Sequence, residues 1–109
     1  MAAEGSFCIR ADHPCLPGHF ESGSVVPGVV LLDEAFALIL AANPDRCVVG
    51  LPSVKFVRPV LPEQIVAVAW HDMPGADEAR VSAGRRITFT CTVAAQVVLR
   101  GSLQLGVAG

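Results

Sequence analysis

An apolar run from Pro27 to Ala42 constrains the fold of this chain more than any other segment. Proline suits the first turn of a helix, because the N–H that it lacks would be unpaired there. Asn43-Pro44 is a helix stop signal, so the sequence predicts a helix over about residues 27–42. Since only Asp33 and Glu34 interrupt its apolar character, we expect this helix to be buried instead of lying on a surface.

Strand-like segments lie on both sides of the predicted helix. In the clearest of them, residues 80–93, aliphatic and aromatic side chains (Ile87, Phe89, Cys91, Val93) alternate with threonines (Thr88, Thr90, Thr92), a pattern typical of a half-buried strand. The other predicted strands are 6–10, 47–51, 54–58, 65–71 and 97–105, with turns at 73–77 and 94–95. The sequence therefore predicts an α+β domain spanning residues 1–109, with one long central helix wrapped by an antiparallel sheet of about five or six strands.

The composition indicates a folded protein with more apolar surface than it can bury alone. Hydrophobic residues make up 52% of the 109 residues and charged residues 17%, which excludes a disordered chain. A chain this short has a high ratio of surface to volume, so part of that apolar surface stays exposed in a single copy. We therefore expect an oligomer, most simply a homodimer, with a hetero-oligomer as the alternative.

Charge and cysteine patterns exclude several function classes. A net charge of −2, and no tyrosine among the aromatic residues, argue against nucleic acid as a partner. The four cysteines form no zinc-ligand pattern, so we expect no metal and no cofactor. The start of the chain lacks the features of a signal peptide, and the apolar run is too interrupted to span a membrane. A soluble cytoplasmic protein is the expectation.

A histidine and an acid form the most informative chemical pattern. His19 lies in the Pro/Gly-flanked turn Gly18-His19-Phe20, and Asp33 follows fourteen residues later within the apolar run. Burying a carboxylate costs several kcal/mol unless it is paired, hydrogen-bonded or protonated. A protonated acid near an imidazole base is the pair that an elimination or hydration reaction needs.

These residues resemble a known family. Gly18-His19-Phe20, Pro27-Gly28 and the acid at position 33 are similar to the 3-hydroxyacyl-[acyl-carrier-protein] dehydratases of the hot-dog fold, and residues 54–62 (VKFVRPVLP) are similar to the segment that follows the helix in that family. The Pro17-Gly18-His19 lead-in and the short length are most similar to the small dehydratases of aryl-polyene pathways. The chain departs from the family pattern at Glu21, Ser22 and Ser24, where the family usually has Pro or Gly, and at Ala37, where it commonly has Gln.

The resemblance implies a reaction with defined roles. His19 would remove the α-proton of a 3-hydroxyacyl thioester on acyl carrier protein, and Asp33 would protonate the leaving hydroxyl, provided that desolvation favours its protonated form. The free N–H groups at the helix start, those of Gly28 and Val29, would stabilise the thioester oxygen as it gains charge. The family also implies that His19 of one subunit works with Asp33 of the other, and that the product is a trans-2-enoyl thioester.

Several alternatives remain open from the residues alone. Glu34 rivals Asp33, and only the family register favours Asp33. His13 and His71 are expected to be peripheral, and Trp70 to pack in the core or an interface. The late arginines (Arg80, Arg85, Arg86, Arg100) are either solvated charges or a patch that docks an acidic carrier. The rival functions are an acyl thioesterase on the same fold and a non-catalytic, carrier-binding subunit of a hetero-oligomer. Acyl-chain length is not readable from the sequence.

Overall fold

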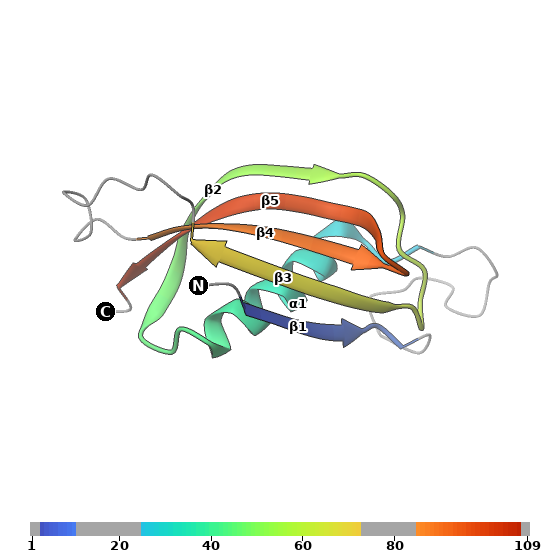
Figure 1. The fold of residues 1–109 in the computed structure, drawn as a ribbon, viewed down its shortest axis with the longest axis horizontal. Coiled ribbons are helices and arrows are strands. Elements are labelled where there is room, and N and C mark those ends of the chain that lie inside the picture. Colours follow the sequence, from blue (N-terminus) through green and yellow to red (C-terminus); the bar gives the residue numbers. More distant parts are fainter. Residues whose placement is uncertain (1–2, 11–24, 73–84, 108–109) are drawn as a thin grey trace.

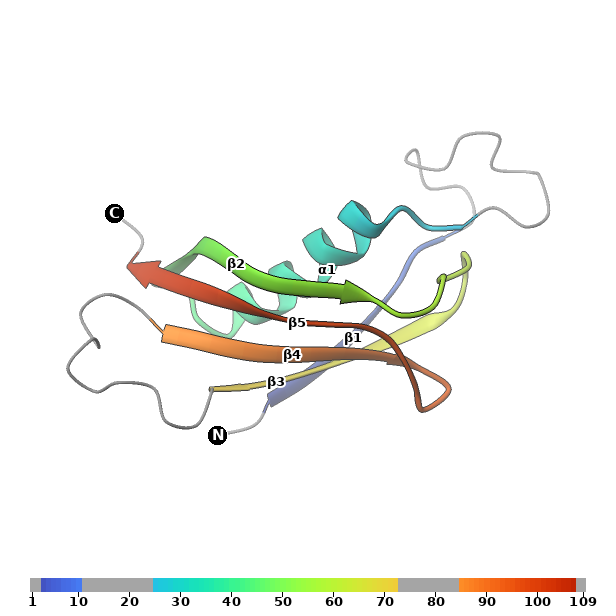
Figure 2. The ribbon, with the colours of Figure 1, turned by 90° about the horizontal axis from the view of Figure 1, so that it is seen from above.

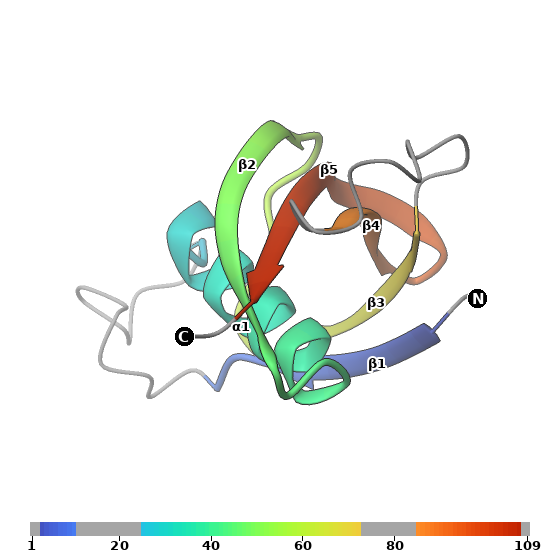
Figure 3. The same ribbon diagram turned by 90° about the vertical axis from the view of Figure 1, so that its left-hand side faces the viewer.

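One helix packs against one face of a five-stranded antiparallel sheet (Figure 1). The computed structural model describes residues 3–10, 25–72 and 85–107. Its elements are β1 (Ala3–Cys8), α1 (Gly28–Ala41), β2 (Arg46–Phe56), β3 (Ile65–Asp72), β4 (Arg85–Val93) and β5 (Gln96–Val107). The strand order is β1-β3-β4-β5-β2, so β1 and β2 are the edges. Figures 2 and 3 show the sheet curving, with α1 against its concave face near the edge strands β1 and β2.

Helix α1 begins and ends close to the predicted limits. Pro27 is its N-cap residue and Ala42 its C-cap residue. At the C-terminal end the Asn43 side chain donates a hydrogen bond to the Ile39 carbonyl at 2.8 Å, and the Ala42 N–H donates to the same carbonyl at 3.2 Å. Within the described residues, no helix is long and apolar enough to cross a membrane.

The expectation of a helix that is buried all round is wrong for the single chain, and a long central helix is not confirmed. The helix has 14 residues, about 21 Å at 1.5 Å per residue, because Asn43-Pro44 stops it. Leu31, Ala35 and Ile39 are buried against the sheet. The opposite stripe, at a spacing of four residues, is exposed to solvent: Val29, Asp33, Ala37 and Ala41. A sheet on one side only can cover one face of a helix, so apolar side chains on the other face stay uncovered.

Two predicted strands are one strand in the structure. Residues 47–51 and 54–58 were expected to be separate, but β2 runs from Arg46 to Phe56 along β5. The register shifts between Val48 and Gly50 and again between Gly50 and Ser53. The prolyl residue at position 52 therefore lies in an irregular part of an edge strand, where a missing N–H is tolerated. The first strand, expected at 6–10, instead covers Ala3–Cys8 because it pairs with β3 from Ile65 to Trp70.

The predicted alternation along β4 is confirmed. Ile87, Phe89 and Cys91 are buried, while Thr88, Thr90 and Thr92 are on the other face and partly exposed. Phe89 meets Phe36 of the helix edge to face, with ring centroids 6.0 Å apart, a favourable arrangement for aromatic rings. Trp70 is also buried in the core, as its sequence context suggested. These contacts fix the helix against the middle of the sheet.

The turn between β4 and β5 has strained residues. Ala94 and Ala95 have φ values of 51° and 67°, and they close a two-residue hairpin between Val93 and Gln96. Positive φ at both central residues defines the turn type that favours Asn-Gly. Replacing Ala94-Ala95 by Asn-Gly is expected to raise the free energy of unfolding by about 1 kcal/mol, measured by urea denaturation. The control is Ala67→Gly at an exposed position of β3, which should lower the free energy of unfolding. An Asn-Gly variant less stable than the parent would contradict the prediction.

Cys91 is a buried thiol with altered acidity. Desolvation raises the pKa of the Cys91 thiol from 9.0 to about 11. Only the thiolate reacts with alkylating agents. A rise in pKa from 9.0 to about 11 therefore lowers the thiolate fraction of Cys91 at pH 8 about 100-fold. We expect iodoacetamide to label exposed Cys8 readily and Cys91 only after unfolding, as measured by peptide mass mapping. Comparable labelling rates for Cys8 and Cys91 in the native protein would show that the core opens there.

Candidate functional site

The helix start exposes two backbone donors. The N–H groups of Val30 and Leu31 both donate to the Pro27 carbonyl, at 3.0 and 3.3 Å. No side chain caps the helix and its first turn contains no acid. Within the described residues, the N–H groups of Gly28 and Val29 therefore have no acceptor. Free N–H groups at the positive end of a helix dipole attract an anion or a polarised carbonyl oxygen.

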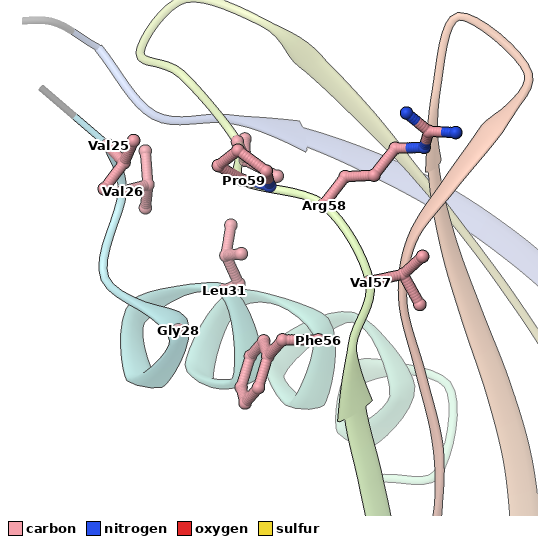
Figure 4. Close-up of a pocket in the computed structure, with 9 residues that line it drawn as sticks. Val25, Val26, Gly28, Leu31, Phe56, Val57, Arg58 and Pro59 are labelled. Carbon is pink, nitrogen blue, oxygen red and sulfur yellow. The ribbon is translucent and has the colours of Figure 1, made fainter. Parts of the chain in front are cut away.

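A cavity of about 330 Å³ opens beside these donors. Its lining is almost entirely apolar and combines the segment before the helix with the end of β2 and the residues after it: Val25, Val26, Gly28, Leu31, Phe56, Val57, Arg58, Pro59 and Val60 (Figure 4). A hydrogen bond from the Val26 N–H to the Val60 carbonyl, 2.8 Å long, ties the two segments together. The helix start is thus held at the wall of a small apolar pocket.

The absence of a side chain at Gly28 lets the Phe56 ring lie close to the helix start. A Cβ atom on Gly28 would lie 2.6 Å from Cε1 and 2.7 Å from Cζ of the Phe56 ring, closer than real carbon atoms approach. The ring lies next to the helix start in Figure 4, and its side chain is 51% exposed. The Gly28 N–H, the Phe56 ring and the cavity therefore form one local arrangement.

Arg58 is the charged residue of this cavity lining. Its guanidinium extends away from the helix start in Figure 4, and its side chain is exposed. Among the described residues the lining contains no carboxylate, so the helix dipole and this cation give the described mouth of the cavity a positive character. An anionic group approaching the mouth is favoured by that charge.

Asp33 does not line this cavity. It lies five residues beyond Gly28, about 7–8 Å along the helix axis, and its side chain is exposed on the stripe that begins with Val29. The described part of the chain therefore does not provide the apolar surroundings expected for Asp33. Glu34, the rival acid, is half-buried and also lies outside the cavity lining.

His19 and His13 lie outside the described residues, so the expected proximity of His19 to Asp33 is not tested. His71 is exposed near the end of β3, opposite Thr88 of β4 and on the sheet face that points away from the helix. Among the described residues, no three histidine, cysteine or acidic side chains gather into a possible metal site. Of the late arginines, Arg86 and Arg100 are exposed, Arg85 begins β4, and Arg80 lies outside the described residues.

The sequence prediction of Gly28 and Val29 as thioester-binding residues stays a prediction; Gly28 lines the cavity, and so do Phe56 and Val60, to which the sequence analysis gave no role. The segment 54–62 was noted as similar to a family segment, but no role was given to its residues. Two prolines around Val60 and an aromatic residue at the end of an edge strand were the available signals. They gain meaning only when the chain is seen to fold back beside the helix start.

The described architecture, a helix held on one side of a curved antiparallel sheet with its uncapped start at an apolar cavity, is that of the hot-dog fold. Within that class the chain belongs to the ApeI-like family of dehydratases, whose family model, described as ApeI dehydratase, matches residues 1–101. The class and the resemblance predicted from the sequence are thereby confirmed. A search of curated protein sequences finds no significant match.

Similar solved structures carry the same fold at low sequence identity. The dehydratase heterocomplex ApeI:P from Xenorhabdus doucetiae is 20% identical with a TM-score of 0.74, covering 96% of this chain and 87% of that one. The (R)-hydratase from A. caviae involved in PHA biosynthesis is 13% identical with a TM-score of 0.76, covering 98% and 94%. A mutant of the fluoroacetyl-CoA-specific thioesterase FlK is 12% identical with a TM-score of 0.71, covering 98% and 91%.

Proposed function

We propose that this protein dehydrates 3-hydroxyacyl thioesters carried on acyl carrier protein to trans-2-enoyl thioesters, in fatty-acid-like or aryl-polyene synthesis in the cytoplasm. The observation that carries the proposal is the helix start, where the N–H groups of Gly28 and Val29 have no acceptor among the described residues and Gly28 lines an apolar cavity, in a chain of the ApeI-like dehydratase family. Such donors stabilise the charge that develops on a thioester oxygen when the α-proton is removed.

In the proposed mechanism, His19 takes the α-proton from the substrate as a neutral imidazole. The electron pair of that C–H bond becomes the new carbon–carbon double bond, passing through a state in which the thioester oxygen is negative. The N–H groups of Gly28 and Val29 donate to this oxygen. The β-hydroxyl leaves with its bonding electrons and takes a proton from Asp33, so that the second product is water. The reaction needs no redox partner because carbon is not oxidised overall.

A second subunit completes the proposed site. Asp33 is exposed on the uncovered helix stripe with Val29, which is 65% exposed, and neighbouring edge strand β2 exposes Val49 and Leu51. A homodimer, or a hetero-oligomer with a related chain, would bury these apolar side chains. It would also remove Asp33 from water and favour its protonated form. His19 of one subunit would then act with Asp33 of its partner.

The acyl carrier protein is proposed to approach the cavity mouth beside Arg58. This exposed guanidinium offers a charge complementary to an acidic carrier and speeds encounter without adding much affinity. The carrier would deliver its thioester arm past Phe56 toward the helix start. A reaction with free short thioesters should not depend on Arg58 in this way.

The test supplies defined 3-hydroxyacyl carrier substrates of several chain lengths and identifies the products by mass. Loss of one water from the acyl group, with the thioester intact, is the expected result. Release of free thiol and a 3-hydroxy acid would instead support a thioesterase, the activity of the similar protein FlK.

A non-catalytic role within a hetero-oligomer is the second candidate, because the similar ApeI:P structure is a heterocomplex. No turnover by the pure chain, followed by turnover when a related dehydratase subunit is added, would support a shared or supporting role. The His19→Ala variant of this chain, mixed with the related subunit, separates a shared catalytic role from a supporting role. If activity persists in the mixture, this chain does not provide the base.

A further inference from the structure

A second hollow, of about 420 Å³, lies on the sheet away from the cavity at the helix start. Its lining comes from three neighbouring strands: Ser53, Val54, Lys55, Thr88, Thr90, Arg100, Gly101 and Ser102. Phe89 and Leu99 of these strands face the helix and are buried. Because side chains alternate along a strand, Thr90 and Arg100 face the other way. The hollow shares no lining residue with the cavity described above.

The strands around this hollow have an unbalanced charge. Lys55, Arg86 and Arg100 are exposed on β2, β4 and β5, and the sequences of these three strands contain no aspartate or glutamate. The whole chain has a net charge of −2, so this concentration of cations does not follow from a generally basic composition. An anion is the natural counterpart of such a face.

Two of the cations oppose each other directly. Lys55 and Arg100 are Cα partners in the antiparallel ladder of β2 and β5, a position in which like charges repel and destabilise the sheet. Arg100 is also the ladder partner of Thr90 on β4. A group with negative oxygens held between the lysine and the arginine would convert this repulsion into two attractive contacts, with the threonine hydroxyl close by.

Hydroxyl groups supply further donors at the same place. Ser102 is the ladder partner of both Ser53 and Thr88, and its side chain is only 9% exposed. The hydroxyl oxygens of Ser53 and Ser102 are 3.1 Å apart. One of these two hydroxyls donates to the other, so the second hydroxyl keeps a hydrogen that is free to donate elsewhere. The hollow is therefore rich in donors, and the lining residues that the structure describes include no carboxylate to accept from them.

We propose that this hollow binds the phosphate group of a small phosphorylated molecule. The Arg100 guanidinium matches the geometry of phosphate oxygens with paired N–H groups, Lys55 contributes a compact positive charge, and the hydroxyls donate to the remaining oxygens. The volume lies in the range of small-molecule pockets, and Val54 and Gly101 add lining that can contact the carbon part of the ligand. The site is independent of the proposed dehydratase reaction.

The experiment is a titration of the ¹⁵N-labelled full chain, followed by amide chemical shifts at constant ionic strength. Inorganic phosphate and phenyl phosphate are the two probes, and sodium chloride is the reference. Saturable shifts at Thr90, Arg100 and Ser102 are expected with either probe. Tighter binding of phenyl phosphate would assign the site to organic phosphate esters, and equal binding would assign it to the phosphate group alone.

Matched variants decide whether the hollow is responsible. Arg100→Gln and Lys55→Gln should each weaken binding at least about tenfold, since each removes a charge-assisted contact. Arg86→Gln removes an equal charge from the same three strands but outside the hollow lining, and it should change affinity less than about twofold. Unsaturable shifts, shifts reproduced by chloride, or an equal loss in Arg86→Gln would overturn the proposal. Circular dichroism checks that each variant is folded.

Discussion

Replacement of Asp33 by asparagine is expected to lower turnover of a 3-hydroxyacyl thioester by about 10²–10⁴-fold, the usual contribution of a general acid. Asparagine has nearly the same shape as aspartic acid but cannot give the leaving hydroxyl a proton. The side chain is exposed in the single chain, so fold and stability should hardly change. The measurements are kcat from enoyl-thioester absorbance, circular dichroism, and sedimentation for oligomeric state.

Glu34→Gln is the matched control, because it changes the neighbouring acid in the same way. It should retain activity within a few-fold of the parent. Full activity in Asp33→Asn, or an equal loss of activity in Glu34→Gln, would show that Asp33 is not the specific general acid and would contradict the proposed mechanism.

Mixing two inactive variants tests whether the site is shared between subunits. In a mixed dimer of His19→Ala and Asp33→Asn chains, one site unites an intact histidine with an intact aspartate, and the other site has neither. Random exchange gives half mixed dimers, so about a quarter of the parental activity should return. If both residues act within one chain, mixing restores nothing.

Replacement of Gly28 by alanine is the second change with a large expected effect. The added Cβ would meet the Phe56 ring at 2.6 Å, so the ring or the helix start must move. Alanine keeps its backbone N–H, so kcat falls only as far as the clash displaces this donor. Full loss of one well-placed oxyanion donor costs on the order of 10²-fold in kcat, and we expect a fall of up to that size. Steady-state kinetics with a fixed acyl chain measure it.

A second substitution tests whether the loss of activity in Gly28→Ala comes from the steric clash with Phe56. Phe56→Ala removes the ring atoms that the new Cβ would meet, so the double variant should recover much of the activity lost in Gly28→Ala. The single Phe56→Ala variant provides the reference for a double-mutant cycle. If the effects of Gly28→Ala and Phe56→Ala on kcat are additive, the contact between these two residues does not position the helix start.

Local signals predicted much of this fold because the elements are punctuated by distinct residues. Pro27 and Asn43-Pro44 mark the helix ends, and the alternation around Phe89 marks a strand with one buried face. The merging of residues 47–51 and 54–58 into β2 was not predictable, since a proline and a glycine read as a turn. Pairing with β5 outweighs that local preference by absorbing extra residues as register shifts.

The site was predicted only as far as backbone chemistry allows. Gly28 and Val29 follow from any helix start, whereas the role of Phe56 depends on a contact between segments that are far apart in sequence. The exposure of Asp33 was missed for a related reason. An apolar run indicates that the side chains on every face of a helix are to be buried. It does not indicate whether the residues that bury them come from the same chain or from another.

The irregular edge strand β2 also affects how strongly the protein resists amyloid-like aggregation. A straight apolar edge with unbroken hydrogen bonding is a template to which further strands add without limit. The register shifts on either side of Gly50, with Pro52 beside them, interrupt that template. The strand can therefore expose Val49 and Leu51 while resisting the open-ended stacking that leads to amyloid.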